Sequence, residues 1–125
     1  MTEPDLDPNT RMAAERTRLA YERTLMAWAR TCTSMIAFGF TIYRLFSFLQ
    51  REPELAEPVI SPGTVGVVMM VAALVALVLA CIQHHQGMRA LRAQFGAMPR
   101  SVALVIAGLI AVLGVIALLA VSLRR

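Results

Sequence analysis

The sequence contains no lysine and few charged residues of any kind. All twelve basic residues are arginine, and only 16% of the 125 residues are charged. A soluble domain normally has about a quarter charged residues and slightly under half apolar ones, whereas this chain is 58% hydrophobic with a mean hydropathy of +0.64. Too few polar residues remain to cover buried helices in water. The composition therefore excludes an ordinary soluble domain and favours a membrane protein.

Several kinds of site lack the residues that they need. Cys32 and Cys81 both lie in apolar runs, where small buried side chains are commoner than a disulfide or a metal pair. His84 and His85 have no further ligands at suitable spacing, so we interpret them as interfacial polar residues. The chain has no GxSxG, HExxH or P-loop motif and no carboxylate dyad. We therefore expect no enzyme activity, no cofactor, no metal and no nucleic-acid partner.

Two further absences concern the membrane. Residues 1–9 are acidic and contain proline but no apolar run, so we expect a disordered tail rather than a cleaved signal peptide. Insertion would then depend on the transmembrane helices themselves. A membrane-embedded carboxylate, which a small proton-coupled multidrug exporter needs, is also missing.

Long apolar runs are present instead. Residues 65–82 and 101–123 carry no charge, and each is about as long as one helical crossing requires. An earlier helix should begin near Asn9 or Thr10 and meet no breaker before Pro53, so it divides into a polar segment, 10–27, and a span. We predict an all-α membrane protein in one domain, 10–125, with spans at about 28–49, 65–83 and 101–123. The arginine-rich segment is continuous with the first of these helices.

Polar connectors should join the spans. Gln50–Thr64, with three prolines and three glutamates, is the first, and Gln83–Met98 is the second, after which Pro99 suits the first turn of the third helix. Small residues at four-residue spacing form packing seams in the last two helices. These residues are Ala72, Ala76 and Ala80, and Ala103, Ala107 and Ala111.

Arginines near the predicted membrane ends indicate the orientation. On one side lie Arg11, Arg16, Arg18, Arg23, Arg89, Arg92 and Arg100. On the other lie Arg51, Arg124 and Arg125, beside Glu52, Glu54 and Glu57. We expect the amino terminus in the cytoplasm and the carboxyl terminus outside.

A seven-residue repeat runs from Glu15 to Thr31. Because seven residues are nearly two helical turns, Arg16, Arg23 and Arg30 form one column with steps of about 10.5 Å. Apolar residues occur on at least two other sides, so the segment differs from a helix lying on a bilayer surface. Sustained seven-residue spacing instead favours packing between helices.

Three interpretations of the column remain open. The arginines could hold lipid phosphates and enforce orientation, or they could line a water-filled axis shared by several copies and attract polyanions. The third is ordinary pairing within the chain, such as Glu22 with Arg18. Arg30 and Arg44 are about 21 Å apart on a helix, so a core of about 30 Å cannot exclude both. We expect both side chains to reach the interface, although a polar track with Ser34 and Thr41 is an alternative.

The segment 22–31, ERTLMAWART, resembles the signature ERTxLAWxRT of the YidH-like family, small bacterial inner-membrane proteins that carry domain of unknown function 202. Met26 replaces the usual leucine, and Ala37-Phe38-Gly39-Phe40 and three helices also fit. The resemblance implies a multi-pass protein of the bacterial plasma (inner) membrane. It marks Glu22, Thr24, Trp28, Arg30 and Thr31 as supporting motif residues.

The same domain looks like the membrane part of the eukaryotic vacuolar transporter chaperone complex, a polyphosphate polymerase and translocase. There, five three-helix subunits surround a pore lined by basic residues. By position, Arg16, Arg23 and Arg100 match its basic rings, while Arg30 matches only the bacterial signature. This chain has no polymerase or phosphate-sensing segment.

The leading hypothesis is therefore an oligomeric membrane subunit, a homo-oligomer and by resemblance a pentamer, forming an anion or polyanion channel with Arg16, Arg23 and Arg100 facing the axis. Its partners would be membrane lipids and a polyanion. The alternatives are a non-conducting structural or regulatory partner of a larger membrane complex, and a holin-like pore former.

Overall fold

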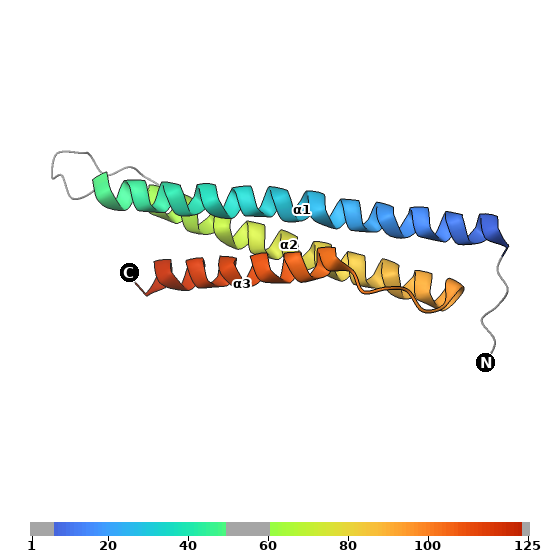
Figure 1. Ribbon diagram of the computed structural model, residues 1–125. Helices are drawn as coiled ribbons and strands as arrows, with labels where there is room; N and C mark the ends of the chain where they lie inside the picture. The colour runs from blue at the N-terminus through green and yellow to red at the C-terminus, as the bar shows by residue number, and fades with distance from the viewer. Residues whose placement is uncertain (1–6, 50–60, 124–125) are drawn as a thin grey trace.

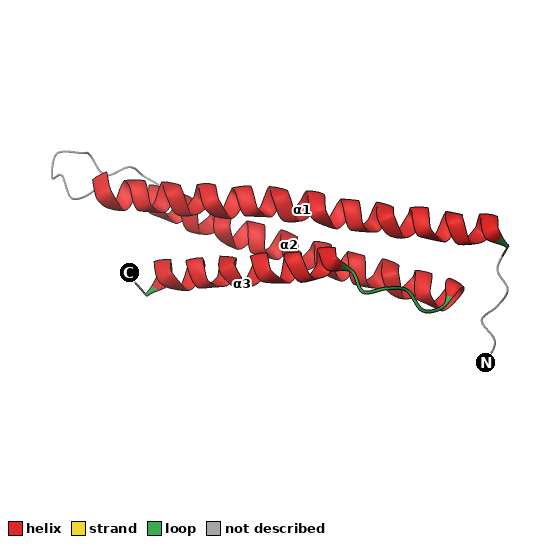
Figure 2. Ribbon diagram, in the orientation of Figure 1, coloured by secondary structure: helices red, strands yellow, loops and turns green. Residues whose placement is uncertain are grey.

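Three long helices make up nearly all of the described protein. The computed structural model describes residues 7–49 and 61–123, with α1 at Pro8–Leu49, α2 at Pro62–Phe95 and α3 at Val102–Ser122 (Figures 1 and 2). Each helix is long and apolar enough to cross a membrane. The predicted class, an all-α membrane protein whose first helix is long, is confirmed. The acidic residues 1–6, most of the first connector with Pro53, and Arg124 and Arg125 lie outside the described residues.

α2 is longer than the sequence predicts. The second helix was expected to end near Ile82, but helical backbone continues through the polar residues to Phe95. There Gly96 ends it, with φ of 87° and its N–H donating to the carbonyl of Arg92. Leaving an apolar environment changes which side chains are favourable, but it does not interrupt the hydrogen bonds of the helix. The expected connector is therefore mostly helix, and only residues 96–101 join α2 to α3.

α3 begins later than predicted. Pro99 lies outside the helix rather than in its first turn. Ser101 is the N-cap, and its hydroxyl oxygen accepts a hydrogen bond from the N–H of Leu104 at 3.4 Å. A serine side chain at this position satisfies one of the backbone donors that the first turn leaves free, which fixes the start of the helix.

α1 packs along α2 through one face, and α3 covers part of the pair (Figure 1). The buried residues of α1 are 3, 4, 7 or 11 positions apart, spacings close to whole helical turns, as one helical face requires. They are Ala14, Leu25, Ala29, Cys32, Gly39 and Tyr43. Cys32 is fully buried, Cys81 is partly buried against the same apolar cluster, and both are free thiols. The prediction of small buried side chains thus holds for Cys32 and in part for Cys81.

The alanine seams are found in part. On α3, Ala103 and Ala107 are buried in the main cluster and Ala111 is packed against it. On α2, Ala80 is buried but Ala72 is exposed. The buried face of α2 instead carries Met70, Ala73 and Leu77. Larger side chains thus share this interface with the small ones.

A set of contacts that we call the histidine layer ties the three helices together near one end. His84 of α2 is 4% exposed. Its Nδ1 lies 3.4 Å from the carbonyl oxygen of Tyr21 in α1, and its Nε2 lies 3.1 Å from the hydroxyl of Ser101. A carbonyl can only accept, so Nδ1 carries a proton and donates it to Tyr21, while Nε2 contacts the serine hydroxyl. His84 is therefore a polar residue buried between the helices, whereas His85 is exposed.

A second set, the tyrosine layer, joins the helices near the other end. The hydroxyl of Tyr43 donates to the carbonyl of Val121 at 3.4 Å, which links α1 to α3. Gly63 of α2 lies against the ring of Tyr43, because a Cβ added to it would be 3.5 Å from that ring. Both layers therefore mark positions that are level with one another on all three helices.

The distance between the two layers is close to the thickness of the hydrocarbon core of a bilayer. At 1.5 Å per residue, they are about 33 Å apart along α1, about 31 Å along α2 and about 30 Å along α3. The hydrocarbon core of a bilayer is about 30 Å thick. α1 and α2 continue past the histidine layer, whereas α3 begins close to this layer and ends close to the tyrosine layer. α1 and α2 therefore extend beyond the start of α3 (Figure 1).

Candidate functional site

The arginine column lies on the face of α1 that turns away from the rest of the protein. Arg23 precedes the buried Leu25 by two residues, which is about 200° around a helix. Arg16, Arg23 and Arg30 are all exposed. We call this surface the outward face of α1, and it also carries Ala20, Ala27, Ser34 and Thr41, which are exposed as well. The seven-residue spacing predicts this shared face, and the structure shows that no other part of the described chain covers it.

The histidine layer gives each arginine a depth. Arg16 lies five residues before Tyr21, about 7 Å beyond the layer, and Arg23 lies about 3 Å on its other side. Arg30 lies about 13 Å from the histidine layer on the same side as Arg23, between the two layers. Arg44 directly follows Tyr43 and is level with the tyrosine layer. Of the column, only Arg30 is therefore deep between the layers.

Serine and threonine hydroxyl groups lie beside the arginines, but each of these hydroxyls already donates a hydrogen bond to a backbone carbonyl. Thr24 and Thr31 donate to the carbonyls of Ala20 and Ala27 at 2.9 and 3.1 Å. Ser34 donates to the carbonyl of Arg30 at 3.1 Å in the same way. Thr17 and Thr41 also bond four residues back. A hydrogen bond of this kind satisfies the hydroxyl donor within its own helix. The guanidinium groups are consequently the free donors of the outward face.

The motif that carries the family resemblance divides between two faces. Leu25 and Ala29 are buried and hold α1 against its neighbours. Arg30 is on the outward face with the threonines, Trp28 is 44% exposed and Glu22 is half-buried. Packing within the subunit therefore explains the presence of Leu25 and Ala29 in the motif. It does not explain the presence of Arg30.

The ion pair within α1 differs from the example considered among the three interpretations, Glu22 with Arg18. Arg18 pairs with Glu15, at 2.9 Å between Nη2 and Oε1, and not with Glu22. The Arg18 side chain is only 13% exposed and its Nε is buried without a hydrogen-bond partner. Three residues place Glu15 on the same side of the helix as Arg18. Arg18 thus belongs to the packed side of α1 and not to the outward face.

Comparison with known families identifies the family. Residues 16–90 match the family described as Domain of unknown function (DUF202). The chain belongs to the DUF202 family. The DUF202 match begins at Arg16 and covers the rest of the column, the histidine at position 84 and Arg89. No curated protein and no solved structure matches this chain.

Arg100 lies outside the DUF202 match and on a different element from the column. It is exposed in the connection between α2 and α3, next to the cap Ser101. Within a single subunit the three arginines predicted for the axis therefore come from two separate elements, α1 and the connection between α2 and α3. Residues 7–49 and 61–123 also contain no group of three or more His, Cys, Asp or Glu that could hold a metal.

Sequence reasoning missed two features that lie away from the column. His84 is buried among three helices, although a pair of adjacent histidines at a span end gives no signal of this. A groove between α2 and α3 reaches His85 and Arg89. Its signal would have been the continuation of α2 past Ile82, which carries Arg89 on helical spacing from Leu77 and Cys81.

Proposed function

We propose that this DUF202 protein is an oligomeric subunit of the bacterial plasma membrane whose outward α1 faces surround a water-filled axis, and that the assembly conducts anions or polyanions. Arg16 and Arg23 form its successive basic rings. The amino-terminal end of α1 lies in the cytoplasm and the end of α3 outside, in accord with the arginine distribution.

The observation that carries the proposal is the position of Arg30. If the two layers bound the hydrocarbon core, α1 crosses it between Tyr21 and Tyr43, and Arg30 lies well inside. The side chain is exposed on the outward face, and the described part of the chain gives it no ion pair. An arginine at the centre of a membrane costs about 2.5–3.5 kcal/mol on insertion scales, so such residues face a bundle interior or a wet cavity. A shared axis supplies that surrounding.

The chemistry of the outward face supports selection of anions. Each free donor on it belongs to a guanidinium group, because the hydroxyls are bonded to their own helix. Arg16 and Arg23 are two turns apart, about 10.5 Å, so an assembly would carry stacked rings of positive charge near its cytoplasmic entrance. Rings of charged side chains are a common basis of selectivity in pores.

Two parts of the proposal rest on the resemblance to the vacuolar transporter chaperone complex. These are the pentameric state and the place of Arg100 in a further ring. The connection that carries Arg100 is at the same end of the helices as the first turns of α1 (Figure 1). Polyphosphate is the polyanion that the resemblance suggests.

Charge reversal at Arg23 tests the proposal. The purified protein is reconstituted in liposomes, and relative chloride and potassium permeability is measured with phosphate and polyphosphate as further solutes. Arg23→Glu should shift preference from anions towards cations, because the ring formed by position 23 changes from positive to negative in every subunit. Arg11→Glu is the matched control, because Arg11 is exposed on the same helix but lies about 120° from Arg23. Arg18 is unsuitable as a control since it is paired and mostly buried.

Two outcomes would contradict the channel. If the arginines only hold lipid phosphates, both substitutions should weaken orientation equally, by about 1 kcal/mol for each arginine, without selective flux in any variant. That result favours a structural or regulatory partner. An unselective leak that is identical in all variants would instead favour a holin-like pore.

A further inference from the structure

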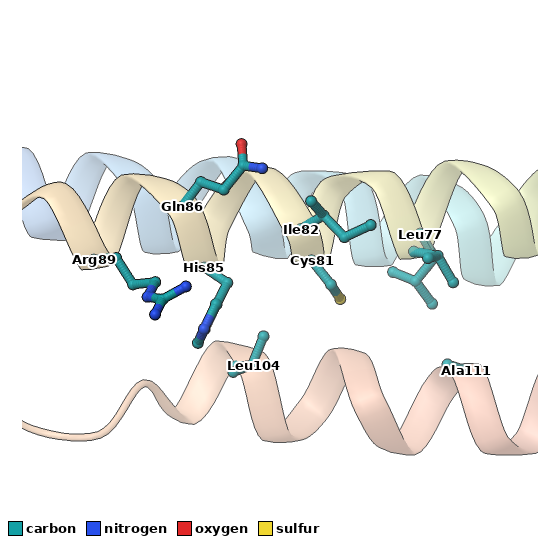
Figure 3. A pocket seen from close by; sticks show the side chains of 9 residues that line it. Leu77, Cys81, Ile82, His85, Gln86, Arg89, Leu104 and Ala111 are labelled. Atoms are coloured by element: carbon teal, nitrogen blue, oxygen red, sulfur yellow. The ribbon is translucent and has the colours of Figure 1, made fainter.

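A groove of about 450 Å³ lies between α2 and α3, on a different surface from the outward face of α1. Apolar side chains line most of its length, and polar ones gather at one end. Figure 3 shows His85 and Arg89 extending from α2 toward α3, with Leu104 and Ala111 on the opposite wall. The full lining is Leu77, Val78, Cys81, Ile82, His85, Gln86, Arg89, Leu104 and Ala111.

The division between apolar and polar lining coincides with the histidine layer. Leu77 and Ala111 lie about 10 and 15 Å to the inner side of this layer, measured along their helices from His84 and Ser101. His85 and Arg89 lie on the other side, Arg89 by about 7 Å. One leaflet of a hydrocarbon core of about 30 Å is about 15 Å deep. The apolar part of the groove therefore has the depth of a single leaflet.

We propose that this groove binds one anionic phospholipid of the leaflet next to the histidine layer, with an acyl chain along Leu77, Cys81 and Leu104 and the phosphate at Arg89. Arg89 is exposed, and the described residues give it no acidic partner. Its guanidinium can form two hydrogen bonds to phosphate oxygens, and His85 can donate one more. A neutral lipid would satisfy the apolar part but would leave the charge of Arg89 uncompensated.

The alternatives do not fit both ends of the groove. A soluble phosphate would bind Arg89 but would leave the apolar part of the groove uncovered. An uncharged acyl chain would cover the apolar part but would not pair with the guanidinium of Arg89. A lipid headgroup with its chain supplies both at the observed spacing. The proposal does not depend on channel function, since the groove and the outward face of α1 are separate.

Lipid retention measured by native mass spectrometry tests the proposal. The intact protein is extracted from nanodiscs that contain phosphatidylglycerol and phosphatidylcholine with identical chains, and the ratio of the two retained lipids is determined. Arg89→Gln should lower the preference for phosphatidylglycerol at least about tenfold, the loss of a hydrogen bond to a charged group. Arg92→Gln is the matched control, with the same change one turn later and outside the lining, and should lower it less than about fivefold.

A second pair of variants tests the apolar part. Val78 lines the groove and is half-exposed, whereas Val75 is equally exposed but does not line it. Val78→Phe should reduce retention of both lipids, and Val75→Phe should not. Circular dichroism and the mass of the assembly confirm that each variant is folded.

Four results would overturn the lipid site. One is an equal loss of preference in Arg89→Gln and Arg92→Gln. Another is equal retention of both lipids by the unaltered protein. Displacement of the retained lipid by glycerophosphate or inorganic phosphate alone would point to a soluble anion. A change of subunit number in Val78→Phe, without any change in lipid, would mark the groove as a contact between copies.

Discussion

Gly39 of α1 and Gly66 of α2 face each other where the two helices touch. A Cβ added to Gly39 would lie 2.7 Å from the carbonyl oxygen of Gly66, and one added to Gly66 would lie 2.5 Å from the carbonyl oxygen of Gly39. Two backbones thus meet without side chains between them, the arrangement that small residues permit in membrane helices. This contact sets how closely α1 can approach α2.

Gly39→Ala should therefore force the helices apart. Overpacking of this kind costs about 1–3 kcal/mol, measurable as the free energy of unfolding in mixed micelles. Gly108→Ala is the matched control, since nothing lies within 4 Å of a Cβ there. Replacing that helical glycine should stabilise the protein by up to about 1 kcal/mol. Equal effects at both glycines would mean that the contact between Gly39 and Gly66 is absent.

The histidine layer predicts that substitutions of the adjacent residues His84 and His85 change the free energy of unfolding by different amounts. His84→Ala removes the contacts to Tyr21 and Ser101 and leaves a buried space, which should cost about 2–3 kcal/mol. His85→Ala should cost little, because His85 is exposed. The same unfolding measurement distinguishes them. A similar loss at both positions would show that the three helices are not held together through His84.

The orientation can be tested with fused reporters. A reporter after Arg125 should be active only outside the cytoplasm, because the arginine-rich ends of α1 and α2 hold the other side inside. A reporter after Ala97, in the connection from α2 to α3, should show the opposite behaviour. Both reporters on one side would contradict three crossings, and reversed activities would contradict the orientation.

The outward face of α1 also predicts assembly. Native mass spectrometry in mild detergent should show a closed homo-oligomer. Ala27→Leu, which adds bulk to the outward face, should reduce the subunit number, whereas Ala120→Leu, on an exposed part of α3, should not. A protein that stays monomeric in both detergent and lipid would contradict the proposed axis.

Three helices and the arginine column could be predicted because each depends on a pattern within one segment. Long uncharged runs determine the spans, and seven-residue spacing places Arg16, Arg23 and Arg30 together whatever packs against the helix. The side of α1 that meets α2 could not be predicted in this way. Apolar residues occur on several sides of α1, and the choice depends on the fit of Gly39 to Gly66 across the interface.

The other differences also arise from contacts between helices. Gln83 to Phe95 is polar and therefore resembles a loop by composition, yet it remains helical. His84 is buried only because Tyr21 and Ser101 reach the same level from other helices. Pro99 suits the first turn of a helix by sequence, but in the structure Ser101 is the cap of α3 and its hydroxyl accepts from the N–H of Leu104.

The most direct test of the central claim is whether water reaches the outward face of α1 at mid-membrane depth. Ser34 precedes Tyr43 by nine residues, and Val112 precedes Val121 by the same number, so the two positions are level, about 13 Å from the tyrosine layer. Both are exposed in the single subunit.

In a protein whose Cys32 and Cys81 are replaced by alanine, Ser34→Cys and Val112→Cys are compared for reaction with a water-soluble methanethiosulfonate in liposomes. Only a hydrated thiol ionises and reacts readily, so a wet axis predicts at least about tenfold faster modification at position 34. Equal, negligible modification of both thiols, with full reaction of each after solubilisation in SDS, would place the outward face in lipid or in a dry contact and contradict the account.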